Sequence, residues 1–342
     1  MKRHIRRAIL FLLVLGTLSA CRIYGIFSTA DPALGLITEQ TDLAAAIPAA
    51  AANSFTLSVV EDYGKEYVVL ASDVAYEGTH LWLMDANLNV LQTLTYADLG
   101  GSAFSGSRVW FDAWDKPPLP PPPHRILVGN ILFGLTADQL ALPGSMIPSG
   151  QGQQFFSIRT GGNFDIAHIY AAGNTLNLSL YDDTWNVHLA KPNMAVIIGP
   201  ASAYSLLAVF SDPHATDTAH TAAFFVFRDM DTGTDHFVKV PWAHIMGTTS
   251  TPLLSNYELF SKPSASDRPE FLGYAADSFF SYSQESGNAG DFIRFDQTGA
   301  VLPGSLHFEK LPDMQVAYSL SGTHYFTFDR TTRVLSRRAA WW

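Results

Sequence analysis

The sequence predicts an all-β fold built from antiparallel hairpins. From residue 55 onward, short apolar segments alternate with turn residues, and few stretches have the length and periodicity of an amphipathic helix. The segment 66–96 predicts three strands, the last two joined at residues 85–87. Similar units recur around Asp182, Asp229, Asp296 and Asp329, with a weaker one at residues 136–138. Aspartate accepts bonds from backbone N–H groups that follow it, and glycine supplies positive φ, so these turns fit tight hairpins.

The spacing of the hairpins indicates a repeat close to that of a four-stranded propeller blade, about 40 to 50 residues. Asp182 and Asp229 are 47 positions apart, but the next two intervals are 67 and 33. The pattern resembles a degenerate β-propeller of about six blades with four antiparallel strands each. It predicts that Asp85 and the four later aspartates occupy equivalent turns. A β-sandwich pair or another all-β arrangement is the alternative.

The segment "RRAAWW" at residues 337–342 predicts a closing strand, or an interface if Trp341 and Trp342 are exposed. The segment "KPPLPPPPH" at residues 116–124 predicts polyproline II, because proline fixes φ and lacks an amide donor. The favoured interpretation of this segment is a stiff loop between strands, and the alternative is a ligand for a groove lined by aromatic side chains.

The first 20 residues have the pattern of an export signal. Lys2, Arg3, Arg6 and Arg7 precede an uncharged apolar stretch that is too short to span a bilayer well. The tetrapeptide Leu18, Ser19, Ala20 and Cys21 resembles the lipobox of bacterial lipoproteins. The resemblance implies cleavage of a signal peptide, residues 1–20, and lipidation of Cys21. An ordinary secretory signal with an incidental cysteine, or a membrane-spanning signal anchor, is the alternative.

The lipobox resemblance also implies a location. The protein is then anchored to a membrane of the bacterial cell envelope through the lipid on Cys21. In cells with two membranes, an aspartate directly after the lipidated cysteine is associated with retention in the inner membrane. Arg22 stands at that position here, so the outer membrane or the surface is expected. Residues 21–53, with two prolines and an alanine run, predict a lipidated N-terminus and tether, which leaves residues 54–342 for the propeller-like domain.

Composition limits the classes of function. Cys21 is the only cysteine, so after lipidation no thiol remains for a disulfide, a nucleophile or a zinc cluster. Loss of residues 1–20 removes four of 21 basic residues and none of 31 acidic ones, which leaves a balance of −14 with histidine neutral. Such a surface repels phosphate backbones, so nucleic acid is not expected as a partner.

The densest polar cluster is "DMDTGTDH" at residues 229–236. Asp229, Asp231 and Asp235 are candidate calcium ligands, because alternating carboxylates around a glycine turn are typical of calcium loops. The cluster partly resembles the Asp-box of sialidase-like propellers through Asp231 and Gly233. A plain hairpin with a solvated acidic tip is the favoured alternative, and no other cofactor is expected.

A second metal hypothesis concerns the segment 211–220, where His214 and His220 lie near Asp212 and Asp217. Its proline and threonine content favours a plain loop over a metal site. Asp182 and Asp183 are adjacent, so on a strand they would face opposite sides, which is unsuited to paired acid and base roles.

Two functions remain open. The favoured one is a lipid-anchored, non-catalytic binding or scaffold module for an envelope protein or a polysaccharide. The alternative is an envelope-anchored propeller glycoside hydrolase or polysaccharide lyase, whose carboxylates converge from separate blades. If the acidic tip is plain turn chemistry, joint replacement of Asp231 and Asp235 by Asn is expected to leave folding nearly intact.

Overall fold

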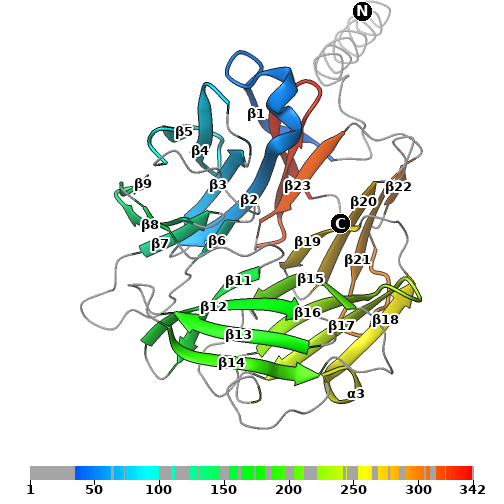
Figure 1. Ribbon diagram of the computed structural model, residues 1–342. Coiled ribbons are helices and arrows are strands. Elements are labelled where there is room, and N and C mark those ends of the chain that lie inside the picture. The colour runs from blue at the N-terminus through cyan, green and yellow to red at the C-terminus, as the bar shows by residue number, and fades with distance from the viewer. Residues whose placement is uncertain are drawn as a thin grey trace, which may run out of the picture.

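The computed structural model describes residues 35–62, 65–72, 74, 76–99, 109–111, 124–128, 131–142, 144–146, 154–160, 163–172, 175–181, 187–196, 204–211, 222–241, 244, 253–263, 269–275, 278–284, 290–303, 306–308, 313–319 and 321–340. Within these residues the strands form six antiparallel sheets, numbered here in chain order (Figure 1). None of the helices in this part of the chain has both the length and the apolar composition needed to cross a membrane.

Sheets 1 to 3 come from the first half of the chain. Sheet 1 contains β2 (Phe55–Asp62), β3 (Lys65–Ser72), β4 (Thr79–Asp85) and β5 (Val90–Thr95). Sheet 2 contains β6 (Val109–Phe111), β7 (His124–Val128) and β8 (Ile131–Thr136), with β9 (Gln139–Leu140) and β10 (Ser145–Met146) both paired to β8. Sheet 3 contains β11 (Gln154–Thr160), β12 (Asn163–Ala172), β13 (Thr175–Tyr181) and β14 (Val187–Val196).

Sheets 4 to 6 complete the set. Sheet 4 contains β15 (Tyr204–Ser211), β16 (Ala222–Asp229), β17 (Thr234–Pro241) and β18 (Glu258–Pro263), with the short helix α3 (Leu253–Tyr257) before β18. Sheet 5 contains β19 (Pro269–Ala275), β20 (Ser278–Gln284), β21 (Gly290–Phe295) and β22 (Leu306–Phe308). Sheet 6 contains β23 (Met314–Tyr318), β24 (His324–Asp329), β25 (Val334–Ala339) and, at its outer edge, β1 (Ile37–Asp42).

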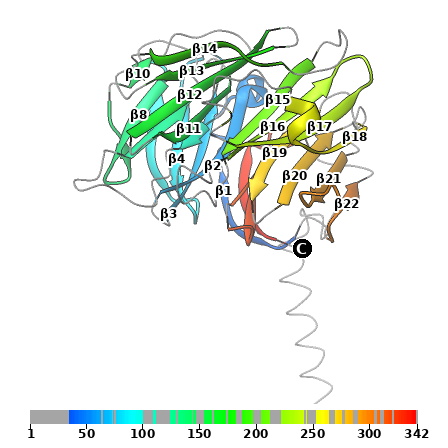
Figure 2. The same ribbon diagram turned by 90° about the horizontal axis from the view of Figure 1, so that it is seen from below.

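The first strands of the sheets pack against one another in a closed succession. β2 contacts β6, β6 contacts β11, β11 contacts β15, β15 contacts β19, β19 contacts β23, and β23 contacts β2. Figure 1 shows these strands nearest the middle of the molecule, and Figure 2 shows the same sheets at right angles to that view. A ring of sheets joined through their first strands is a β-propeller. The prediction of an all-β, propeller-like fold is therefore confirmed.

The apolar interior lies in layers between neighbouring sheets. One layer joins sheet 4 to sheet 5, where Phe224 and Phe237 pack with Tyr274, Phe279 and Phe295. The rings of Phe224 and Phe279 meet edge to face with centroids 5.3 Å apart, an arrangement that aromatic pairs prefer. β16 is buried along its whole length. Many aromatic side chains are therefore packed between neighbouring sheets.

The ring is closed by β1, which lies far from the rest of sheet 6 in sequence. β1 pairs antiparallel with β25, from Ile37 opposite Arg338 to Asp42 opposite Val334. β25 is thus an inner strand of this sheet, and β1, from the N-terminal segment, is its outer strand. This agrees with the expectation that the segment 337–342 contributes a strand, although Trp341 and Trp342 lie outside the described residues.

The predicted tether over residues 21–53 is corrected by this pairing. Its second half is part of the folded domain, because β1 belongs to sheet 6 and the short 3₁₀ helix η2 (Ala49–Ser54) follows it. Leu43, Ile47 and Ala52 are buried in the layer between sheets 6 and 1. Sequence composition missed this because every residue of β1 after Ile37 is polar or acidic, so this edge strand carries little apolar signal. Residues 21–34 lie outside the described part.

The aspartate turns fall into two classes, so the prediction that all five are equivalent is wrong. Asp85 and Asp296 join the third and fourth strands of their sheets, whereas Asp229 and Asp329 join the second and third. Successive strands run in opposite directions, so the two classes lie at opposite ends of the strands. Asp182 lies outside the described residues.

The two classes also differ in hydrogen bonding. Asp85 Oδ1 accepts bonds from the second and fourth following N–H groups, and the third following residue, Leu88, has φ of 62°. Asp229 Oδ1 accepts from the second and third following N–H groups, and positive φ comes at the fourth residue, Gly233. Asp296 repeats the first pattern and Asp329 the second.

Turns of the first class sit in the seams between sheets. Leu88 is buried in the layer between sheets 6 and 1. A Cβ placed on Gly299, which has φ of 82°, would lie 2.7 Å from the ring of Phe260 in sheet 4. The turn that carries Asp138 binds sheet 1, where Lys65 forms an ion pair with Asp138 and the hydroxyl of Tyr67 donates to it over 2.6 Å. These turns fasten each sheet to the one before it.

Removal of β1 tests the closure. A chain that begins at Ser54, the domain boundary expected from composition, should unfold at a much lower temperature than one that begins at Ala33. The reason is that it loses the outer strand of sheet 6 and the buried side chains that follow it. Thermal unfolding followed by circular dichroism measures the difference, and equal melting temperatures for the two chains would contradict the closure role.

Candidate functional site

Three aromatic rings gather at one end of sheet 1. The rings of Tyr76 and His80 stack with centroids 4.3 Å apart, and the rings of His80 and Tyr96 lie 5.4 Å apart. Tyr76 comes from the loop between β3 and β4, His80 from the start of β4, and Tyr96 from the turn after β5. His80 is buried, and both tyrosines are half-buried. We call these three residues the Tyr–His–Tyr cluster.

Hydrogen bonds within the loop hold the cluster in place. The Tyr76 hydroxyl donates to the carbonyl oxygen of Thr79, and Nε2 of His80 lies 2.8 Å from the carbonyl oxygen of Tyr76. Burial raises the pKa of Tyr76 to about 12, so its hydroxyl stays protonated even in solutions alkaline enough to ionise an ordinary tyrosine. The rings of Phe55 and Tyr76 meet edge to face with centroids 6.0 Å apart. The cluster is therefore a fixed feature and has a buried histidine between two partly accessible rings.

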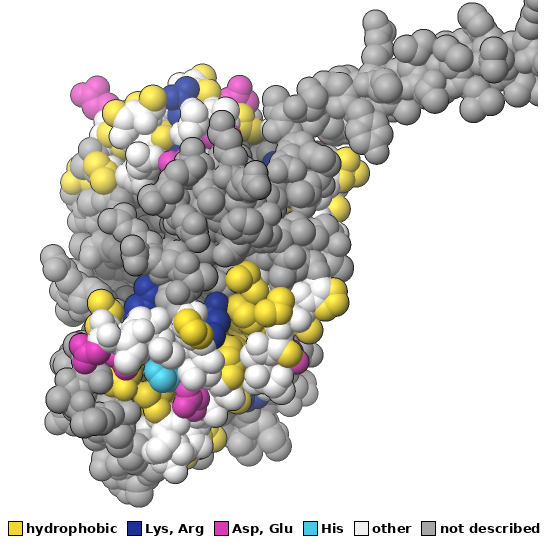
Figure 3. Space-filling view, turned by 90° about the vertical axis from the view of Figure 1, so that its right-hand side faces the viewer, with side chains coloured by type: hydrophobic (Ala, Val, Ile, Leu, Met, Phe, Trp, Pro, Cys, Tyr) yellow, Lys and Arg dark blue, Asp and Glu magenta, His cyan; other side chains and the backbone are white. Residues whose placement is uncertain are grey.

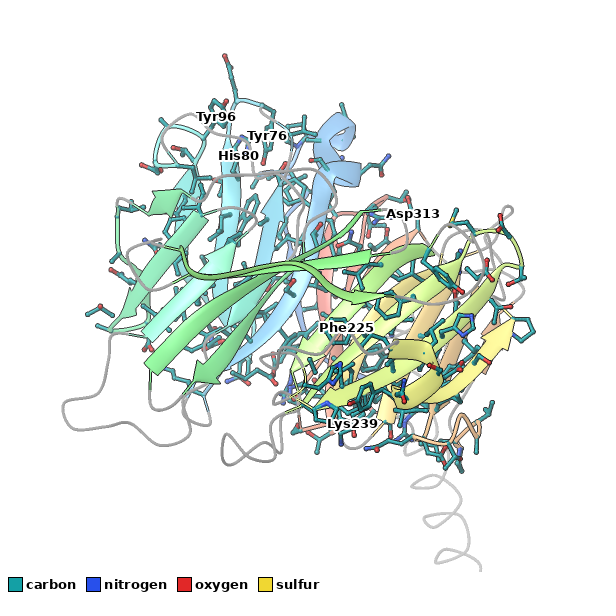
Figure 4. The ribbon with its side chains drawn as sticks, turned by 60° about the horizontal axis from the view of Figure 1, so that its bottom comes forward. Tyr76, His80, Tyr96, Phe225, Lys239 and Asp313 are labelled. Atoms are coloured by element: carbon teal, nitrogen blue, oxygen red, sulfur yellow. The ribbon has the colours of Figure 1, made fainter. Side chains whose placement is uncertain are left out.

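The cluster lies at the end of the propeller where the first strands begin, because Phe55 starts β2. Figure 4 shows Tyr76, His80 and Tyr96 together at this end, with Asp313, which immediately precedes β23, nearer to it than Lys239. We call it the cluster end. β2 and β23 run in the same direction, since the side chain of Gln315 near the start of β23 accepts from Leu57 N over 2.6 Å near the start of β2.

The opposite end carries the start of β1 and the end of β25. β25 runs in the same direction as β23, because each is antiparallel to β24, so it ends away from the cluster. β1 is antiparallel to β25, and Ala339 N donates to the carbonyl oxygen of Leu36 over 2.9 Å. We call this the linker end, and define it by Gly35, Leu36, Ala339 and Ala340.

The surroundings of the cluster are polar and acidic. Glu77 and Asp98 are exposed beside it. The N–H and the hydroxyl of Thr95 each donate to Asp98 Oδ2 over 2.7 Å, and these bonds hold the pKa of Asp98 below its ordinary value. Tyrosine rings offer flat apolar faces with a polar tip, and carboxylates accept hydrogen bonds, so the arrangement fits a ligand with an apolar face and hydroxyl donors. Sequence reasoning missed the cluster, although Tyr76 and His80 stand four positions apart around Gly78.

The three candidate calcium ligands do not come together. Asp229 caps its own turn, and although burial opposes ionisation, the N–H groups of Asp231 and Thr232 hold its pKa below the ordinary value. Asp231 is exposed at the tip of the turn. Asp235 is buried on β17 and faces Arg228 across the hairpin. Among the described residues no group of three or more His, Cys, Asp and Glu side chains is placed to hold a metal ion.

Asp235 and Arg228 form a buried ion pair with two hydrogen bonds. Arg228 Nε donates to Oδ1 over 2.9 Å and Nη2 donates to Oδ2 over 3.2 Å. The side chain of Asp235 is 1% exposed and that of Arg228 is 10% exposed. Two parallel bonds between a guanidinium and a carboxylate make a strong, oriented contact. The expectation that Asp231 and Asp235 can be replaced together without harm to folding is therefore corrected, because one of them is exposed and the other is paired in the interior.

Other ionisable side chains in the described part also make contacts that support the fold. His324 Nε2 lies 2.5 Å from Glu66 Oε1 and links sheet 6 to sheet 1. His236 Nδ1 lies 2.8 Å from Glu258 Oε1 between β17 and β18. Arg330 Nη1 donates to Asp313 Oδ1 over 2.8 Å. Figure 3 shows charged side chains dispersed among apolar ones over the described part of one side of the molecule.

Several sequence-based candidates lie outside the described residues. They are Cys21, residues 116–123 of the proline-rich segment, Asp182 and Asp183, and the group Asp212, His214, Asp217 and His220. His124, the last residue of the proline-rich segment, is the first residue of β7. The lipidation hypothesis and the second metal hypothesis therefore stay predictions.

Comparisons with known proteins give likeness only at the level of structure. No protein-family model and no curated protein matches the sequence. The WD40 domain of Neurospora crassa Pan2 has a TM-score of 0.47 and 10% identity, with 91% of this chain and 97% of that chain covered. The β-propeller domain of Myceliophteria thermophila Cps50 (Swd1) has a TM-score of 0.48 and 9% identity, with 82% of this chain and 96% of that chain covered.

A third solved structure with a likeness is the SapL1 lectin in complex with alpha methyl fucoside. It has a TM-score of 0.41 and 12% identity, and 85% of this chain and 98% of that chain are covered. The propeller fold of the present chain is derived from its own sheet order and from the contacts between its first strands.

The two aspartates of the acidic hairpin should respond differently to the same change. Asp235→Asn removes the charge that faces buried Arg228 and should lower the free energy of unfolding by about 3 to 5 kcal/mol. Asp231→Asn, at an exposed turn position, should change it by less than about 0.5 kcal/mol. Urea denaturation of both variants measures the difference. Similar losses in the two would contradict the role assigned to the ion pair.

Proposed function

We propose that the protein is a lipid-anchored, non-catalytic binding module of the bacterial cell envelope, held to a membrane through Cys21. The observation that carries the proposal is the division of the propeller into two ends. The chain enters β1 at the linker end, and the Tyr–His–Tyr cluster lies at the other. A lipid on Cys21 would therefore attach the domain on the side of the linker end and leave the cluster at the end opposite the attachment, where an envelope partner can reach it.

The length of the linker supports this arrangement. Gly35 lies fourteen positions after Cys21, and a fully extended chain between them spans at most about 50 Å. Such a length limits how far the linker end can lie from the headgroups. In cells with two membranes we place the protein in the outer membrane or at the surface, because Arg22 follows the cysteine.

Binding is favoured by the way the cluster is built. Tyr76 and Tyr96 present partly accessible rings, while the hydroxyl of Tyr76 and Nε2 of His80 are already held by backbone oxygens. Preformed aromatic surfaces lose little conformational entropy on binding. The exposed carboxylates of Glu77 and Asp98 suit a neutral glycan, whose hydroxyl groups donate hydrogen bonds and whose C–H face stacks on aromatic rings.

Replacement of Cys21 tests the anchor. The Cys21→Ala variant should move from the membrane fraction to the soluble fraction and lose its partition into detergent, because no acyl chain can be attached. Fractionation and detergent phase separation measure this, with the full chain as the reference. Retention of the variant in the membrane with unchanged detergent behaviour would refute lipidation at Cys21.

A second experiment tests binding without catalysis. A soluble form that begins at Arg22 should bind at least one neutral polysaccharide in a panel, and Tyr96→Ala should weaken that binding about tenfold through loss of an accessible ring. Val74→Ala, an exposed apolar position at the same end, is the matched control. Affinity electrophoresis measures binding, and analysis of chain length measures cleavage. Cleavage of a polysaccharide would argue for the hydrolase or lyase instead.

A further inference from the structure

The stretch of chain that builds sheet 1 and the strand before it is strongly acidic. Residues 35–99 contain nine aspartates and glutamates, and Lys65 is the only lysine or arginine among them. Lys65 begins β3, which runs antiparallel to β2, so it lies at the linker end, where it forms an ion pair with Asp138. The Tyr–His–Tyr cluster at the other end therefore has no lysine or arginine of its own sheet near it.

Two carboxylates flank the rings of the cluster. Glu77 directly follows Tyr76 and is exposed. Asp98 lies two positions after Tyr96 and is also exposed. Within the described part of the chain, neither carboxylate forms an ion pair. Asp98 Oδ2 accepts both bonds from Thr95, which leaves Oδ1 for a ligand. Because these bonds hold the pKa of Asp98 below its ordinary value, its charge persists in mildly acidic solution.

The rings of the cluster add to this negative site. Tyr96 is half-buried, and its hydroxyl makes no hydrogen bond with another described residue. The face of a tyrosine ring carries negative potential and attracts a cation, most strongly where water is partly excluded. A neutral sugar can stack on the ring and donate from its hydroxyl groups. Only a ligand that also carries positive charge gains from the ring face and the two carboxylates together.

We propose that the Tyr–His–Tyr cluster binds a glycan whose sugars carry a protonated amino group, with the ammonium group held by Glu77 and Asp98. The proposal rests on the glycan-binding function proposed above and narrows its substrate class. Stacking of the sugar on Tyr96 is retained, and the charge is added to it. A sugar is favoured over a lysine side chain because it combines the cation with a C–H face for the ring and with further hydroxyl donors.

Three tetrasaccharides that share one linkage test this. They are the tetramers of glucosamine, N-acetylglucosamine and glucose, which carry an amine, an acetamide or a hydroxyl group at the same carbon. Isothermal titration calorimetry of the chain that begins at Arg22 measures the affinities, in a buffer acidic enough to protonate the amines. The glucosamine tetramer should bind about tenfold more tightly than the other two. Added salt should reduce that difference, because it screens exposed charges.

Variants separate the charge from the rings. Glu77→Gln removes a charge without removing a contact in the described part, so it should lower the preference for the glucosamine tetramer and leave the affinity for the glucose tetramer unchanged. Joint Glu77→Gln and Asp98→Asn should abolish the preference. Asp231→Asn, which removes the same charge from an exposed turn at the cluster end of sheet 4, is the matched control and should change neither affinity. Tyr96→Ala should weaken all three tetramers, which share the stacking contact.

Three results would overturn the proposal. They are equal affinity for the amine and acetamide tetramers, a preference for the amine that survives the joint replacement, and tighter binding of tetralysine than of the glucosamine tetramer, which would assign the site to a cationic peptide. Thermal unfolding confirms that each variant is folded. If the glucose tetramer binds and the amine adds nothing, only this inference fails. If no saccharide binds, the glycan-binding function fails with it.

Discussion

The pairing of β1 with β25 is the contact on which the rest of the ring depends. Thr38 and Arg337, which are joined by a hydrogen bond across it, are 299 positions apart. The chain entropy lost on closing such a loop grows only slowly with loop length. The pairing of one strand and the burial of the residues that follow β1 can therefore offset this loss. With this pairing, β23 and β2 are held side by side and no sheet is left at an open end.

Aspartate turns add to this closure at the seams between sheets. In the turns of Asp85 and Asp296, the carboxylate binds two backbone N–H groups and positive φ comes at the third residue. This geometry directs Leu88 and Gly299 toward the preceding sheet. The turns of Asp229 and Asp329 lie at the other end of the strands. The carboxylates of these four turns thus stabilise local backbone geometry, and Asp235 neutralises a buried guanidinium.

The two ends of the propeller are chemically different, and the difference follows from strand direction. β1 and β25 place the chain entry and exit at one end, and the loop between β3 and β4 places Tyr76 and His80 at the other. Because successive strands run in opposite directions, loops that follow odd-numbered strands of a sheet lie at one end and loops that follow even-numbered strands lie at the other. The chain therefore enters and leaves the described fold at one end, and the accessible rings lie at the other.

The sequence by itself determined the all-β class, the recurring hairpins and the turn positions, because apolar alternation and aspartate or glycine at turns act over a few residues. The two classes of turn could be told apart in part from the sequence. The residue with positive φ falls three positions after Asp296 and four positions after Asp229, and in both turns it is a glycine. Tertiary structure alone decided that residues 37–42 close the ring, that Asp235 meets Arg228, and that Tyr96 joins Tyr76 and His80. Each depends on which strands become neighbours, and long-range pairing leaves no periodic trace in the residues that make it.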